Sequence, residues 1–162
     1  LNSAKALADQ DKYQFEWWAL SLIGARPAQD KKKGADSGID GLIYFFDDES
    51  GIAKKMVIQI KGGHVTRSQI ATLKGDIERE KASIGVFVTL NDPTKPMVKE
   101  AAETGFYEAP DGIQYPKLQI FTINELLDGK EIEYPSYLFD VTHKRAQHKS
   151  KQKLGKQTEM DV

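Results

Sequence analysis

The chain has 162 residues, of which 40% are hydrophobic and 29% are charged, and its formal net charge is −1. This length favours a single domain, and the composition is ordinary for a globular protein. No apolar stretch approaches the roughly 20 residues that a membrane span requires, so we expect no membrane segment. Because the net charge is near zero, any case for nucleic-acid binding has to come from local patches.

The chain contains no cysteine. This excludes disulfides, thiolate zinc sites and cysteine nucleophiles, and it fits a cytoplasmic location. The N-terminus lacks the charged-then-apolar pattern of a secretory signal. Because the sequence begins with Leu1 rather than Met, we expect it to be a piece of a longer chain.

The first long helix is expected from Lys12 to about Gly24, with Asp11 as its N-cap, after a short arm or helical turn at residues 1–10. Apolar residues surround most of this helix, which predicts that it is largely buried. Glu16 stands in the middle of the apolar run. A buried carboxylate has to be paired, hydrogen-bonded or near a metal. An ion pair with a residue such as Arg26 and a role in a metal site both remain open for it.

A hairpin is expected next, with strands at residues 42–46 and 56–61 and a polar turn at residues 47–51. Asp40 lies where the first strand begins. Alternation along the second strand places Gln59 and Lys61 on one face. A carboxylate, an amide oxygen and an ammonium group therefore converge on one side of a small sheet.

These three groups suit the metal-assisted hydrolysis of a phosphodiester. Mg2+ prefers hard oxygen ligands, and a bound metal activates water and neutralises developing charge. Lys61 would orient the attacking water or stabilise that charge. The competing interpretation is that Asp40 is an ordinary turn residue and that Lys61 extends into solvent from a strand end.

A helix is expected from Arg67 to about Ala82, opened by a capping box of Thr66 and Gln69. Ile70, Leu73 and Ile77 would face the sheet, and the polar side would include Asp76. The N-terminus of this helix follows Lys61 closely and offers free N–H groups to a phosphate. The candidate nucleic-acid contacts are Lys32, Lys33, His64, Thr66, Arg67 and Gln69. A solvated lysine run and an ordinary loop histidine are the competing interpretations.

The second half of the chain predicts a buried central strand at residues 84–90, parallel to the strand before it. A helix capped by Thr94 follows, then a loop at residues 106–116 and a short strand at residues 118–121. Thr122 and Glu125 form a second capping box, which opens a short helix.

We place the domain boundary at residue 140, so that residues 1–140 form the folded domain and residues 141–162 a basic C-terminal tail. The cations of this tail are Lys144, Arg145, Lys149, Lys151, Lys153 and Lys156. A soluble tail and an arm that holds nucleic acid are both open.

Three ordered pieces carry a family resemblance: Glu16 on a helix, the segment at residues 34–40 that ends in Gly38-Ile39-Asp40, and Gln59-Ile60-Lys61. Together they resemble the PD-(D/E)XK nuclease superfamily, and within it the Mrr-like restriction endonucleases, over residues 11–127. The run is also similar to domains attached to adenine-specific DNA methyltransferases. Gln59 replaces the usual second acid, as is typical of the Mrr-like branch. The resemblance implies an α/β fold, restriction-endonuclease-like, with a mixed central sheet flanked by helices.

The resemblance also implies a Mg2+-dependent DNA endonuclease of a restriction–modification system, for which Mn2+ could serve as well. Asp40, the Gln59 side chain and the backbone carbonyl of Ile60 would bind the metal, and Lys61 would activate the water. Glu16 would hold a metal-bound water or a second metal. The implied partners are DNA and a fused or separate DNA methyltransferase. A homodimer is expected because double-strand cleavage needs two sites.

Two other functions remain open. A non-catalytic DNA-binding module would keep the fold and the basic surface without cleaving. A docking domain of a methyltransferase would instead present a large exposed apolar patch.

Overall fold

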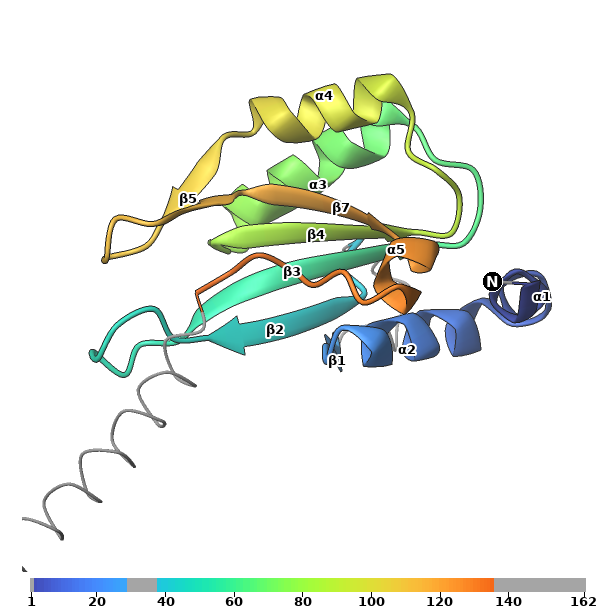
Figure 1. Ribbon diagram of the computed structural model, residues 1–162, viewed down its shortest axis with the longest axis horizontal. Helices are drawn as coiled ribbons and strands as arrows, with labels where there is room; N and C mark the ends of the chain where they lie inside the picture. The colour runs from blue at the N-terminus through green and yellow to red at the C-terminus, as the bar shows by residue number, and fades with distance from the viewer. Residues whose placement is uncertain (1, 29–37, 136–162) are drawn as a thin grey trace, which may run out of the picture.

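The computed structural model describes residues 2–28 and 38–135. Its larger sheet has five strands in the order β1-β2-β3-β4-β7. These strands are β1 (Arg26–Pro27), β2 (Gly41–Phe45), β3 (Lys54–Lys61), β4 (Ile84–Thr89) and β7 (Leu118–Thr122). The helices of the described residues are α1 (Asn2–Gln10), α2 (Lys12–Leu22), α3 (Arg67–Arg79), α4 (Lys95–Glu103) and α5 (Ile123–Leu127). The expected α/β architecture, a mixed sheet flanked by helices, is confirmed (Figure 1).

The sheet is antiparallel on one side and parallel on the other. β2 pairs antiparallel with β1 and with β3, and Gly41 lies opposite Ile58. β3, β4 and β7 run parallel. The carboxyl ends of these three strands therefore meet at one edge, where α3, α4 and α5 begin. This edge is where ligands bind in many open α/β sheets.

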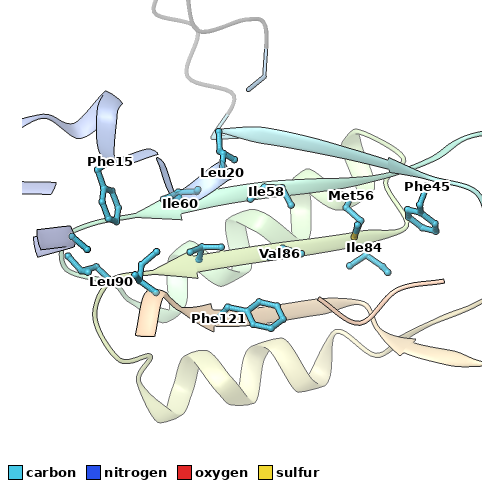
Figure 2. Close-up of a cluster of buried hydrophobic side chains, with 14 residues drawn as sticks. Phe15, Leu20, Phe45, Met56, Ile58, Ile60, Ile84, Val86, Leu90 and Phe121 are labelled. Atoms are coloured by element: carbon cyan, nitrogen blue, oxygen red, sulfur yellow. The ribbon is translucent and has the colours of Figure 1, made fainter. Parts of the chain in front are cut away.

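Helices cover both faces of the sheet (Figure 1). One apolar cluster, the α2-side core, gathers residues of α2, α5 and the strands: Phe15, Leu20, Ile58, Ile60, Val86 and Phe121 are among its members (Figure 2). The second cluster, the α3-side core, includes Ile39, Val57, Leu73, Ile77, Phe87 and Met97. β3 and β4 are buried on both faces, which explains why their sequences are nearly continuous apolar runs.

The predicted helix starts are confirmed at the atomic level. Asp11 accepts hydrogen bonds from the backbone N–H groups of Tyr13 and Gln14, at 3.1 and 3.2 Å. Thr122 accepts from the N–H of Glu125 at 3.0 Å, and the Glu125 carboxylate accepts from the N–H of Thr122 at 3.1 Å. These side chains satisfy amides that have no partner within the helix.

Three expectations about local structure were wrong. Residues 2–10 form a full helix, α1, because Ala4 and Leu7 pack on the α2-side core. α2 is not largely buried, since Tyr13 and Trp17 are 67% and 65% exposed. Residues 106–116 are not merely a loop, because β5 (Phe106–Glu108) and β6 (Gln114–Pro116) pair as a two-stranded sheet.

The chain after α5 crosses the α2-side face as an extended segment. Ile132 packs on the α2-side core, and Tyr134 lies 5.7 Å from the Phe45 ring, centroid to centroid. The buried side-chain amide of Gln119 donates to the carbonyl of Glu133 at 2.6 Å and accepts from its N–H at 2.9 Å. The Gln119 side chain thus fixes the extended segment over the α2-side face of β7.

None of the helices in residues 2–28 and 38–135 is both long enough and apolar enough to cross a membrane.

Candidate functional site

Asp40 lies just before β2 and is clamped to β3. Its backbone N–H donates to the carbonyl of Ile58 at 2.8 Å. Its carboxylate oxygen Oδ2 accepts from the backbone N–H of Ile60 at 2.7 Å. The preceding residue, Ile39, is buried in the α3-side core. The structure therefore brings Asp40 and Ile60 together as expected, but through the amide of Ile60, with the carboxylate serving as a backbone acceptor.

Gln59 and Lys61 share one face of β3, as the alternation predicted, because Ile58 and Ile60 belong to the α2-side core. Gln59 lies opposite Phe87, a residue of the α3-side core, so its side chain points towards α3. It is only 4% exposed. No residue in the described part of the chain gives its buried Oε1 atom a hydrogen bond.

A residue that the sequence analysis assigned to a polar surface joins this site. Asp76 of α3 is 2% exposed, and its carboxylate forms an ion pair with Arg79. A Cβ atom placed on Gly38 would lie 3.2 Å from Asp76 Oδ2 and 3.8 Å from Gln59 Nε2. Helical spacing could have predicted this burial, because position 76 follows Leu73 by three residues and so falls on the buried side of the helix.

Glu16 is buried, as expected, at 5% exposure. It belongs to α2, whose neighbouring residue Phe15 lies in the α2-side core. Gln59 and Lys61 point to the other face of the sheet. α2, the helix that carries Glu16, packs on the α2-side core, whereas Gln59 and Lys61 face α3.

The predicted nucleic-acid contacts cluster around the N-terminus of α3, where His64, Thr66 and Arg67 are exposed. Gln69 has a structural task, since its Oε1 accepts from the backbone N–H of Thr66 at 3.0 Å. The Thr66 hydroxyl lies 2.8 Å from the hydroxyl of Ser68 and does not cap the helix. The remaining two predicted contacts, Lys32 and Lys33, lie outside the described residues.

The N-terminus of α4 lies beside that of α3. A groove of about 420 Å³ runs between them and is lined by Arg67, Lys95, Pro96, Lys99, Glu100 and Glu103. Arg67 Nη1 lies 3.5 Å from Glu100 Oε2. The loops before the two helices are tied together, because Asn91 Nδ2 donates to the carbonyl of Gly63 at 2.8 Å.

The donor set does not fit a catalytic Mg2+ site. Asp40 already uses one carboxylate oxygen on the Ile60 amide, and Gln59 offers a neutral oxygen in place of a second carboxylate. The described residues hold no group of three or more Asp, Glu, His or Cys side chains able to bind a metal. The positive charge of Lys61 further lowers the attraction for a dication. The expectation of Mg2+ or Mn2+ stays a prediction.

The order of strands and the placement of Asp40, Gln59 and Lys61 define a restriction-endonuclease-like domain. The chain belongs to the family described as NACHT-associated inactive restriction endonuclease 1, whose model matches residues 12–128. No curated protein and no solved structure matches the chain.

This family corrects the functional expectation. The prediction of an active Mg2+-dependent endonuclease was wrong, because the family is described as inactive. The restriction-endonuclease-like relationship itself is confirmed.

Proposed function

We propose that the domain is a non-catalytic nucleic-acid-binding module that retains a restriction-endonuclease-like scaffold. One observation carries this proposal: the N-terminus of α3 is exposed, the Thr66 hydroxyl makes no cap hydrogen bond to its first-turn amides, and His64 and Arg67 on either side of Thr66 are exposed as well. α4 and α5 differ, because Thr94 and Thr122 accept hydrogen bonds from their first-turn amides. First-turn N–H groups that the N-cap side chain leaves free attract an anion such as a backbone phosphate, and the helix dipole adds to this attraction.

The name of the family associates such domains with NACHT proteins. We therefore propose that the module acts within, or together with, a NACHT-bearing chain, and that it supplies recognition of nucleic acid to that chain. The finer link to Mrr-like enzymes and to DNA methyltransferases is an alternative setting for the same module. A homodimer was expected only for double-strand cleavage, so that reason falls with the nuclease.

The test is fluorescence anisotropy of labelled double-stranded and single-stranded DNA, in EDTA, at low and moderate salt. We expect binding that weakens steeply with salt, because phosphate neutralisation releases counterions. Arg67→Ala should lower the affinity about fivefold and reduce the salt slope by about one. Lys74→Ala removes the same charge two turns further along α3 and should change the affinity less than about twofold.

Two results would contradict the proposal. One is the absence of any binding at low salt. The other is an equal loss in Arg67→Ala and Lys74→Ala, which would show that only the overall charge matters. Metal-dependent cleavage of the DNA would restore the nuclease instead.

A docking module is the second candidate, and a separate observation favours it. Tyr13 and Trp17 are one helical turn apart on α2, and both are exposed by more than half. Aromatic residues of this kind are enriched at the centres of protein interfaces. Binding to a purified NACHT-bearing or methyltransferase chain that is lost in Trp17→Ala and kept in Arg67→Ala would support docking over nucleic-acid recognition.

A further inference from the structure

Three segments that are distant in the sequence meet in a buried polar cluster, which we define as Gly38, Gln59 and Asp76. Gly38 precedes β2, Gln59 lies in β3 and Asp76 in α3. A Cβ atom added to Gly38 would lie 3.2 Å from Asp76 Oδ2, closer than ordinary van der Waals contact. Gly38 also has φ +73°, a left-handed conformation that favours glycine. Both the conformation and the space therefore require glycine at this point.

Asp76 is held in a fixed orientation within this cluster. Its Oδ1 atom accepts from Arg79 Nη2, and Arg79 is 59% exposed, so the guanidinium reaches in from the surface. Oδ2 faces Gly38. A carboxylate in this position places α3 close beside the chain that leads into Asp40, with room there for glycine alone.

The residues that follow Gly38 continue the same attachment. Ile39 is buried in the α3-side core, and Asp40 accepts from the amide of Ile60. The segment at residues 38–40 is therefore fixed on one side by α3 and on the other by β3. A shift of Asp76 would therefore displace Gly38 and Ile39, and with them the hydrogen bond between Asp40 and Ile60.

We propose that Asp76 is a positioning residue, which fixes Gly38 beside α3 and thereby fixes the Asp40–Ile60 contact next to Lys61. The effect on nucleic-acid affinity rests on the proposed function, whereas the effect on Asp40 and Ile60 does not. Asp76 itself touches no ligand in this proposal.

The chain offers a matched control for Gly38. Gly51 has a similar left-handed φ of +77°, but a Cβ placed there would meet nothing within 4 Å. Gly38→Ala and Gly51→Ala therefore both force alanine into a left-handed backbone conformation, and only Gly38→Ala adds a steric clash with Asp76. Glu78→Gln, an exposed change on the same helix, is the control for Asp76→Asn.

The readout is hydrogen exchange of single amides, measured by NMR on the whole chain. We expect Gly38→Ala and Asp76→Asn to speed exchange of the Ile60 amide about tenfold, while the Val86 amide in the central strand changes far less. The two controls should leave the Ile60 amide unchanged. Equal acceleration at Ile60 and Val86 would mean a general loss of stability, and no acceleration at Ile60 would mean no coupling. Either result overturns the proposal.

DNA affinity provides the second readout. Asp76→Asn removes a negative charge, which by electrostatics alone would strengthen binding to DNA. We expect the opposite, a loss of about fivefold in both Asp76→Asn and Gly38→Ala. If the wild-type protein does not bind DNA at all, the proposed function fails and the amide exchange alone decides the role of Asp76. If the wild type binds and neither variant weakens it, the positioning proposal fails for the ligand surface.

Discussion

Replacement of Asp40 tests whether its carboxylate stabilises the folded state rather than taking part in catalysis. Asp40 Oδ2 accepts from the Ile60 N–H at 2.7 Å, and Ile60 is 1% exposed. Asp40→Ala leaves this amide without its acceptor, which costs about 1–3 kcal/mol. Asp40→Asn keeps a neutral oxygen at the same place and should cost about half as much, because hydrogen bonds to charged groups are about twice as strong.

The assay is urea unfolding followed by circular dichroism, with thermal unfolding as a second measure. For a chain of this size a loss of about 2 kcal/mol lowers Tm by roughly 4–8 °C. Asp92→Ala is the control, because Asp92 is exposed. The reasoning is refuted if Asp40→Ala is as stable as Asp92→Ala, since the Ile60 contact would then contribute nothing.

Further outcomes follow from other contacts. Gly41→Ala would press a Cβ against Leu20 Cδ2 and place it 2.9 Å from the carbonyl oxygen of Arg26, so this variant should be less stable by about 1–3 kcal/mol. A Cβ on Gly75 meets nothing within 4 Å, so Gly75→Ala should stabilise α3 by about 0.5–1 kcal/mol. The urea midpoints of the two variants test both expectations. The hydrogen bond from Lys130 lowers the pKa of Glu125 below its ordinary value of 4.5. The ionised Glu125 therefore stabilises the fold at pH values above 4.5, and this stabilisation is lost as the pH falls through the lowered pKa. Glu125→Gln should therefore be less stable than the wild type at pH 7 and should match it in acid; a difference that persists at low pH would rule out this ionisation as the cause. Addition of Mg2+ or Mn2+ should leave Tm unchanged, while an increase that Asp40→Ala abolishes would support the metal expectation instead.

The buried pair of Asp47 and Tyr107 allows one more stability test. The Tyr107 hydroxyl donates to Asp47 Oδ2, and no described residue bonds to the buried Oδ1 atom. Tyr107→Phe should destabilise by about 1–3 kcal/mol, because the carboxylate loses the bond from the tyrosine. Tyr44→Phe is the control, since Tyr44 is 54% exposed. Equal urea midpoints for the two variants would contradict this.

The sequence by itself determined most of the elements. Alternation and continuous apolar runs placed β3 and β4, because strands buried on both faces leave that pattern. Side-chain caps placed α2 and α5, because Asp11 and Thr122 act on amides only two or three residues away. The order of Glu16, Asp40 and Gln59-Ile60-Lys61 also predicted a restriction-endonuclease-like fold.

Only the tertiary structure decided what these residues do. Helical spacing could not show that Asp76 turns towards Gly38 and Gln59, because that contact joins segments far apart in the chain. The motif likewise could not show that the Asp40 carboxylate accepts a hydrogen bond from the Ile60 amide. Sequence order fixes which groups are present, whereas strand pairing and layer packing decide which of them meet. The nuclease prediction failed because the family to which the chain belongs is described as inactive, which the residues of the motif do not reveal.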